Sequence, residues 1–268
     1  MTKETLRRGL GSAESRILSD LASEGRVIFS IDELSKKTSS RPLARKMAST
    51  LSRKKWVERL SRGLYLILEL AAGSKPEWSE DSFYIASKLA RPYYLGYLSM
   101  LHYYSWTEQV PNTISVVTTK ITTPKIIHGT KYEFVTLSKK KFFGYKETNI
   151  RGHTIVVSDP EKTLVDALDH PEYCGGIDEV KKAIVYAKVD WGKVITYAER
   201  MGNGAIYKRM GFLLEEMGVP ISKEIIEDLR GRLTTGYAPL YPTAGNTGKY
   251  NTRWNIQINT DISRGDLE

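Results

Sequence analysis

The first forty residues alternate short apolar runs with polar boundaries in a pattern that predicts two helices. A first helix starts at Ser12, whose side chain can cap it, and carries apolar residues at helical spacing until Gly25 ends it. After a short apolar link, Ser30 and Glu33 form a capping box. This box predicts a second helix that ends near Lys37.

A third helix is predicted from the polar turn at residues 38–40 to about Lys54. Pro42 fits its first turn, where the missing N–H costs no hydrogen bond. The helical projection gives two faces: an apolar one with Leu43, Ala44, Met47, Ala48 and Leu51, and an opposite one with Arg45, Ser49, Ser52 and Arg53, beside Lys46. One side is therefore expected to be core and the other basic and hydroxylic.

Two short apolar runs, at residues 56–60 and 64–68, predict a β-hairpin. Residues 61–63 form its turn and place Arg62 at the tip. Three helices followed by a basic hairpin predict a winged helix-turn-helix domain over residues 1–72.

A domain boundary is predicted at residues 71–76, which are small and end in proline, with a second domain over residues 77–268. A helix is expected from Ser79 to about Arg91. The strongly aromatic stretch at residues 93–104 is expected to form another helix whose rings belong to the core.

The pattern then changes to β-branched runs at residues 113–119, 132–137, 142–150 and 153–157, which predict a small, mostly antiparallel sheet. Helices are expected around residues 160–169, 178–188, 191–201, 204–217 and 222–231, with a late strand at 254–258. The predicted fold class is α+β, with a winged helix-turn-helix followed by a larger α+β domain that ends in a helical set.

Composition narrows the class of protein. A chain of 268 residues with 41% hydrophobic and 26% charged residues is typical of a globular protein and not of a disordered chain, a collagen or a rod. Cys174 is the only cysteine, so no intramolecular disulfide can form. The charged start of the chain and the lack of a long apolar stretch predict a cytoplasmic protein without a membrane span.

Positive charge is concentrated in the N-terminal part. The net charge is +9, and residues 1–70 contribute 15 basic and 8 acidic residues, a net +7. No acidic residue occurs between Glu33 and Glu58, while eight lysines and arginines do. A solvated surface helix normally mixes both signs, so this stretch favours an anionic partner.

The position of this charge indicates DNA. The third helix of a winged helix fits the major groove of B-DNA, where arginine and serine side chains reach base edges, and the wing can meet phosphate or the minor groove. The candidate DNA-binding residues are Arg41, Arg45, Lys46, Ser49, Arg53 and Arg62. A winged helix that binds protein, with its lysines merely solvated, is the alternative interpretation.

A second basic spot, formed by Lys139, Lys140 and Lys141, lies between two predicted strands. It is either a solvated turn or a second patch that contacts phosphate.

No enzymatic motif emerges from the sequence. The glycines at 245 and 248 are too close for a phosphate-binding loop. Asp159, Glu161 and Lys162 suggest a nuclease metal site, but such sites usually place the acid and the lysine on alternate positions of one strand face, whereas here they are adjacent. Capping of a helix explains these residues instead. Cys174 has only His170 near it in sequence, which is a weak indication of a nucleophile. We therefore expect no catalytic residue, metal or cofactor.

Three stretches in a fixed order, with one late segment, carry a resemblance to a known family. The stretches are Ser61-Arg62-Gly63-Leu64-Tyr65 at the end of the predicted winged helix, then Tyr94-Leu95-Gly96-Tyr97-Leu98-Ser99 with His102 and Tyr103, then Asp159-Pro160-Glu161-Lys162-Thr163-Leu164-Val165-Asp166-Ala167; the late segment is Arg253-Trp254-Asn255-Ile256 with Asn259. On these residues the chain resembles the AbiE-type antitoxins (AbiEi family) of prokaryotic type IV toxin–antitoxin systems over about residues 12–260.

The resemblance implies a transcriptional autorepressor that binds inverted repeats of double-stranded DNA upstream of its operon. It also implies that the C-terminal domain helps to bind DNA and counters a nucleotidyltransferase-like toxin, for which no stable complex is required. A monomer or weak dimer that acts cooperatively on DNA is expected. Two alternatives stay open: a ligand-sensing winged-helix regulator with a small molecule in its aromatic-rich second domain, and a DNA-processing enzyme that uses the acids near Asp159.

Overall fold

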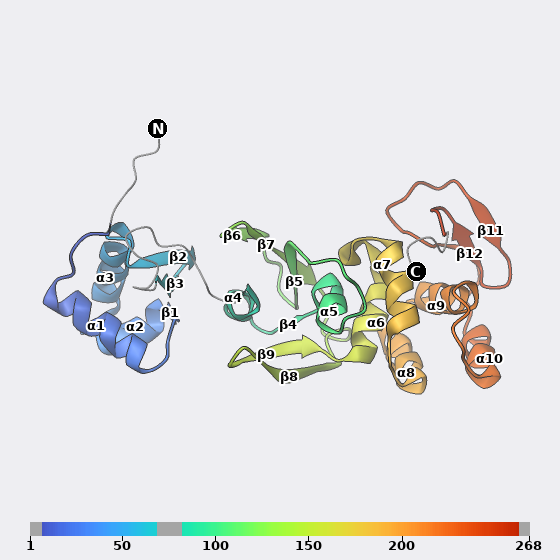
Figure 1. The fold of residues 1–268 in the computed structure, drawn as a ribbon, viewed down its shortest axis with the longest axis horizontal. Coiled ribbons are helices and arrows are strands. Elements are labelled where there is room, and N and C mark those ends of the chain that lie inside the picture. The colour runs from blue at the N-terminus through green and yellow to red at the C-terminus, as the bar shows by residue number, and fades with distance from the viewer. Residues whose placement is uncertain (1–6, 69–81, 263–268) are drawn as a thin grey trace. The chain divides into compact units, whose positions relative to one another are not determined.

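A computed structural model describes residues 7–68 and 82–262 of the chain (Figure 1). Its contacts divide the chain into two compact units, residues 1–89 and 90–268. The predicted boundary at residues 71–76 and the predicted helix start at Ser79 lie outside the described residues.

The first unit has the order and pairing of a winged helix. Its strands form an antiparallel sheet in the order β1-β3-β2, in which β3 pairs with both neighbours. The elements are α1 (Ser12–Ser23), β1 (Ile28–Ser30), α2 (Ile31–Lys37), α3 (Arg41–Arg53), β2 (Val57–Ser61) and β3 (Leu64–Ile67), followed after the undescribed stretch by α4 (Ser82–Leu89). The predicted three helices and hairpin are confirmed.

Local capping sets where these helices begin. The capping box is confirmed, because the Ser30 side chain accepts from Glu33 N while the Glu33 carboxylate accepts from Ser30 N. The predicted cap of α1 is wrong. Ser12 is the first helical residue, and Gly11 is the N-cap, with its N–H donated to the Glu14 carboxylate at 2.7 Å. A carboxylate in the first turn thus replaces the expected hydroxyl.

The second unit is built on a six-stranded sheet in the order β6-β7-β5-β4-β9-β8. Three of its pairings are antiparallel and two, β5 with β7 and β4 with β9, are parallel. The strands are β4 (Tyr93–Leu95), β5 (Thr113–Thr118), β6 (Lys125–Ile127), β7 (Thr130–Thr136), β8 (Tyr145–Ile150) and β9 (His153–Ser158). The mostly antiparallel sheet is confirmed, with more parallel character than expected.

One predicted helix is partly a strand. Residues 93–104 divide into β4, which pairs with β5 and β9 in the interior of the sheet, and the short helix α5 (Tyr97–Tyr103). Gly96 separates the two as the N-cap of α5. The run is buried nearly throughout, so its pattern shows neither a helical nor a strand period and cannot distinguish the two.

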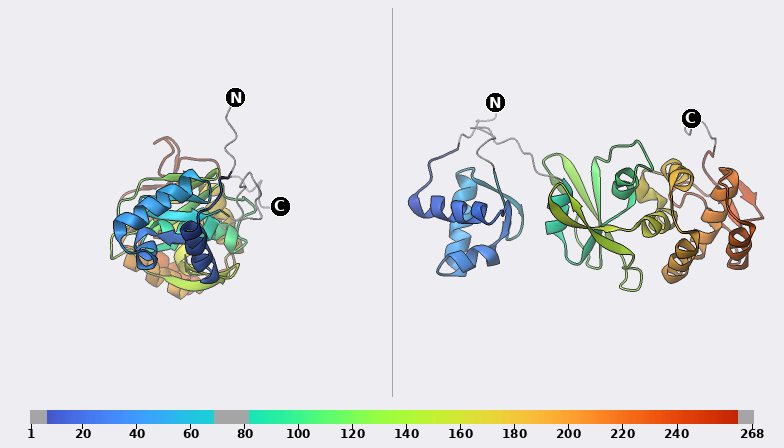
Figure 2. Two further views of the ribbon diagram at one scale, coloured as in Figure 1. Left: turned by 90° about the vertical axis from the view of Figure 1, so that its left-hand side faces the viewer. Right: turned by 60° about the horizontal axis from the view of Figure 1, so that its bottom comes forward.

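The C-terminal helices follow the prediction closely. Within the second unit, the sheet lies at one end and α8 to α10 at the other (Figures 1 and 2). The helices are α6 (Pro160–Asp169), η2 (Pro171–Cys174), α7 (Ile177–Tyr186), α8 (Trp191–Met201), α9 (Gly204–Glu216) and α10 (Lys223–Gly231). A small sheet in the order β10-β12-β11 closes the chain, formed by β10 (Ala238–Pro239), β11 (Lys249–Asn251) and β12 (Ile256–Ile258).

Trp254 joins this last segment to the helices. Its side chain is fully buried, and its Nε1 donates to Glu215 at the end of α9 at 2.6 Å. The indole lies against Gly211, where a Cβ would stand 2.0 Å from the ring. The glycine is therefore required by this close approach, not by its backbone angles.

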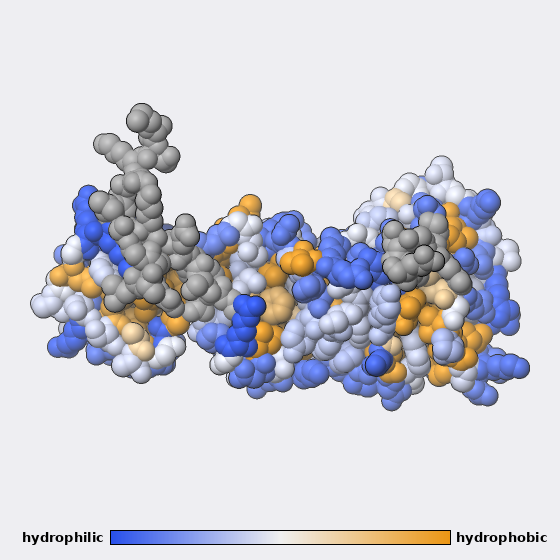
Figure 3. Space-filling view, in the orientation of Figure 1, coloured by the Kyte–Doolittle hydropathy of each residue, from blue (hydrophilic) through white to orange (hydrophobic). Residues whose placement is uncertain are grey.

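The surface carries scattered apolar side chains. Figure 3 shows hydrophobic spots separated by hydrophilic ones over the visible face of the second unit. In the described ranges, no helix combines the length and the apolar character that crossing a bilayer requires.

Candidate nucleic-acid interface

Helix α3 presents the basic face that the projection predicts. The Ser40 side chain caps it by accepting from Leu43 N at 3.4 Å, and Pro42 stands in its first turn. Ala44, Ala48 and Leu51 are fully buried and fix the inward side. Arg45, Lys46, Ser49 and Arg53 are all exposed on the outside.

The inward side of α3 is narrower than predicted. Leu43 is 41% exposed and Met47 only half-buried, so neither belongs to the fully buried seam. Both side chains line a groove against α1 together with exposed Arg16. The core contacts of α3 are made by its two alanines and Leu51, because small side chains let the helices approach closely.

Acidic residues of α1, its C-cap and α2 form ion pairs with some of the cations that lie between Glu33 and Glu58. Lys54 Nζ bonds the Glu14 carboxylate at 2.6 Å, and Arg41 Nη2 lies 3.0 Å from Asp32. Lys37 pairs with Glu24 in the same way. Three of the eight cations are therefore already paired within the domain.

The remaining cations of α3 are free. Among the residues that the structure describes, Arg45, Lys46 and Arg53 form no ion pair. Hydrogen bonds from Lys54 and from the backbone of Gly11 hold the pKa of Glu14 below its ordinary value, and the charge of Arg53 adds to this effect. Three uncompensated positive charges therefore lie on the outward face of α3.

The wing carries one more exposed cation. Strands β2 and β3 are joined by Arg62 and Gly63, and Gly63 has a φ of +78°, which glycine adopts without strain. Gly63 O accepts from Ile31 N at 2.8 Å, so the turn is tied to the start of α2. Arg62 is exposed at this tip, as predicted, and has no ion-pair partner in the described ranges.

The second basic spot is divided in two. Lys141 Nζ pairs with Asp169 at 3.2 Å, and that carboxylate is fully buried at the end of α6. Lys139 and Lys140 are exposed in the turn after β7. Lys141 thus has a structural contact, and only its two neighbours point to solvent.

A buried polar cluster escaped the sequence prediction. Lys162 and Asp166 lie one turn apart on α6 as a fully buried ion pair. Tyr94 from β4 donates its hydroxyl to Asp166 at 2.9 Å and accepts from Lys162 Nζ at 3.0 Å. Burial raises the pKa of Asp166 while Lys162 opposes that shift. The spacing of Lys162 and Asp166 was visible in the sequence, but the tyrosine 72 positions away was not.

The acids near the start of α6 serve structural roles. Asp159 caps α6 by accepting from Lys162 N at 2.8 Å and also accepts from Lys193 and Tyr197 at 3.1 and 3.0 Å. Burial would raise the pKa of Glu161, but bonds from Lys193 and from the backbone hold it below its ordinary value. The capping interpretation is confirmed. The described residues contain no group of three histidines, cysteines or carboxylates suited to a metal ion.

Cys174 lacks the surroundings of a nucleophile. Its side chain is fully buried, and burial raises the pKa of the thiol well above its ordinary value, which disfavours the reactive thiolate. His170 instead contacts Glu172, with 2.9 Å between Nδ1 and Oε1.

Comparison with known proteins gives a fold and no family. No family model matches the chain, and no curated protein matches it significantly. A solved structure that is similar is the Rv2827c protein of Mycobacterium tuberculosis, with a TM-score of 0.67 and 13% identity over 95% of this chain and 94% of that one. The chain therefore shares the α+β fold of that mycobacterial protein along nearly its whole length.

Proposed function

We propose that the chain is a DNA-binding transcriptional regulator whose helix α3 reads the major groove. The observation that carries the proposal is the set of exposed cations without an ion pair on α3, which are Arg45, Lys46 and Arg53. The exposed Ser49 lies one helical turn from both Arg45 and Arg53. Arginine and serine side chains at this position of a winged helix reach base edges. Arg62 at the wing and the Asp32-paired Arg41 add phosphate contacts.

The resemblance to AbiE-type antitoxins supplies the biological role in this proposal. The protein binds inverted repeats upstream of its own operon in the cytoplasm, acts as a monomer or weak dimer with cooperativity on DNA, and counters a nucleotidyltransferase-like toxin without a stable complex. The exposed Lys139 and Lys140 are the residues of the second unit that would add to the DNA contact.

Fluorescence anisotropy tests the DNA-binding part. The full chain is titrated with a duplex from upstream of its own gene and with a scrambled duplex, at about 0.15 M salt, where electrostatic binding is partly screened. Preference for the native duplex by about a thousandfold or more supports a specific regulator. Equal affinities contradict it.

Co-expression tests the antitoxin part. The chain should restore growth of cells that express the neighbouring toxin gene. Failure to do so, with DNA binding intact, would leave a regulator without antitoxin activity.

A further inference from the structure

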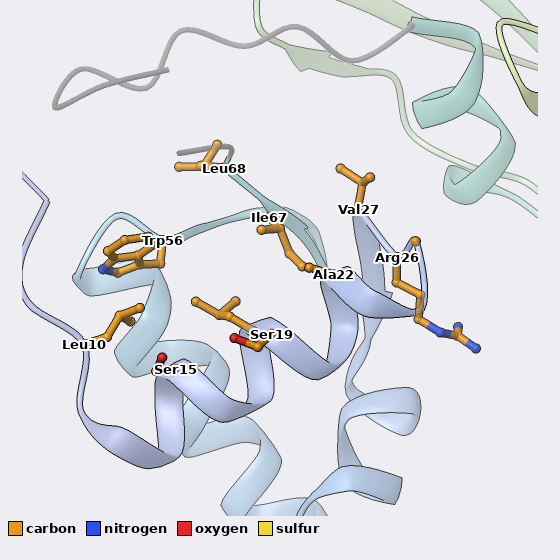
Figure 4. A pocket seen from close by; sticks show the side chains of 11 residues that line it. Leu10, Ser15, Ser19, Ala22, Arg26, Val27, Trp56, Ile67 and Leu68 are labelled. Atoms are coloured by element: carbon orange, nitrogen blue, oxygen red, sulfur yellow. The ribbon is translucent and has the colours of Figure 1, made fainter. Parts of the chain in front are cut away.

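A cavity of about 400 Å³ opens in the first unit between α1 and the β2–β3 hairpin (Figure 4). Figure 4 shows Ser15, Ser19 and Ala22 of α1 on one side. On the other side are Ile67 of β3 and the residues that flank the hairpin, Trp56 and Leu68. The apolar lining includes Leu10, Leu18, Ala22, Trp56, Ile67 and Leu68. It lies away from the outward face of α3 and has no part in the DNA contact proposed above.

The lining carries no free charge. Arg26 is the only charged side chain among the described residues that line the cavity, and in Figure 4 its guanidinium points away from the other labelled side chains. It pairs with Glu24 at 2.9 Å and with Glu33. Ser15 and Ser19 supply hydroxyls from α1. The chemistry suits an uncharged, largely apolar molecule with a polar group that reaches one of these serines.

The size of the cavity favours a small molecule over a second copy of the chain. Its volume of about 400 Å³ falls in the range of small-molecule sites, roughly 300–1,000 Å³. A stable interface between proteins instead needs an extended patch of about 800 Å² on each partner.

One wall of the cavity also supports helix α3. Leu18 lines the cavity and belongs to the same hydrophobic core as Ala48 and Leu51 of α3. A molecule that presses on this side of α1 therefore acts on the layer against which α3 packs. Tightly packed cores transmit such displacements because they contain few voids.

We propose that this cavity binds a small, uncharged, largely apolar molecule, and that its occupancy changes the DNA affinity of α3. The effect on DNA affinity, which is the regulatory half of the proposal, rests on the proposed function. The binding of the molecule, which is the binding half, does not.

The binding half is tested with N-phenyl-1-naphthylamine, an uncharged dye that fluoresces in apolar sites. Two exposed alanines of α1 offer a matched pair of variants: Ala22 lines the cavity, whereas Ala13 lines the groove next to α3. Wild type and Ala13→Phe should bind the dye saturably. Ala22→Phe should bind it about tenfold or more weakly, because the added ring takes up space in the cavity that the dye would occupy.

Equal dye binding by all three proteins, or loss in Ala13→Phe alone, overturns the proposal. If a second copy or the protein's own chain already fills the cavity, wild type will not bind the dye, and this outcome also overturns the proposal. Sedimentation then shows whether a second copy is bound. Thermal unfolding verifies that Ala22→Phe is folded, and Ala22→Met provides a smaller replacement if it is not.

The regulatory half is tested by repeating the DNA titration with saturating dye. The DNA affinity of wild type and Ala13→Phe should change by about threefold or more, while that of Ala22→Phe should stay constant. Bound dye with unchanged DNA affinity overturns the regulatory half. If none of the proteins binds DNA, the proposed function is wrong, and so is the proposed effect of the bound molecule on DNA affinity. The dye titration alone then decides whether the cavity binds a small molecule.

Discussion

Arg41, the first residue of α3, forms an ion pair with Asp32 of α2, with 3.0 Å between Nη2 and Oδ1. Both side chains are exposed, so the pair contributes little to stability. In a complex with DNA, a phosphate would have to compete with Asp32 for this guanidinium. The carboxylate therefore acts as an internal competitor at the edge of the proposed interface.

Replacing Asp32 should strengthen DNA binding. Asp32→Asn releases Arg41 and should raise the affinity about two- to fivefold, within the ~1 kcal/mol of an exposed ion pair. Asp20→Asn, which removes an exposed carboxylate from α1 without an ion pair among the described residues, is the matched control and should have a smaller effect. Anisotropy titrations measure both. Equal gains in DNA affinity for the two variants would show that the gain comes from the change in net charge and not from the release of Arg41.

Arg45 should contribute to sequence preference. Arg45→Ala should weaken operator binding by about 1–3 kcal/mol, and Arg53→Ala likewise, if the side chain reads a base edge. Arg45→Lys keeps the charge but loses the bidentate fork, so it should lower the ratio of operator to scrambled affinity. An unchanged operator affinity in both alanine variants would disprove the role of α3.

Arg62 at the wing should behave as a phosphate contact. Arg62→Ala should lower the affinity for native and scrambled duplexes alike and reduce the slope of log K against log salt by about one. Titrations at four salt concentrations measure that slope. A loss of sequence preference at constant slope would assign the residue to base reading instead.

The buried pair on α6 should be sensitive to the loss of one partner. Lys162→Met leaves the Asp166 carboxylate buried without its cation and should cost about 3–5 kcal/mol of unfolding free energy. The double variant Lys162→Met and Asp166→Leu should be less destabilised than the single one. Asp228 and Arg232 form an exposed pair at the same spacing, so Asp228→Asn should cost at most about 1 kcal/mol. Urea unfolding of the full chain measures all three.

Glu14 should make the first unit sensitive to acid. Because its folded-state pKa lies below the ordinary value of 4.5, its stabilising contribution is complete above that value and is lost as the pH falls through the folded-state pKa. Native-state hydrogen exchange at amides of α1 should therefore show protection falling with pH more steeply in wild type than in Glu14→Gln. Parallel profiles would show that the bonds of this carboxylate do not stabilise the domain.

The elements set by local signals could be predicted from the sequence. The helices α6, α8, α9 and α10 begin at polar caps, Asp159, Asp190, Asn203 and Ser222, whose side chains accept from backbone N–H groups as such residues do in many proteins. The exposed face of α3 could be predicted as well, since burial of its alanines fixes the rotation of the helix.

The features set by distant contacts could not be predicted. β4 is a strand because β5 and β9 lie on both sides of it, although its own residues carry no strand period. Which cations of the acid-free stretch are free depends on acids up to 40 positions away, as with Glu14 and Lys54. The bond between Tyr94 and Asp166 depends in the same way on the packing of α6 against the sheet.

The contact between Gly211 and Trp254 bears on how proteins of this fold can diverge. Because the indole occupies the space of a side chain at 211, neither position can change alone without a cavity or a clash. Relatives that carry a larger residue at the first position should carry a smaller one at the second. This covariation would mark positions 211 and 254 as a contacting pair in the sequences of relatives, although 43 residues separate them along the chain.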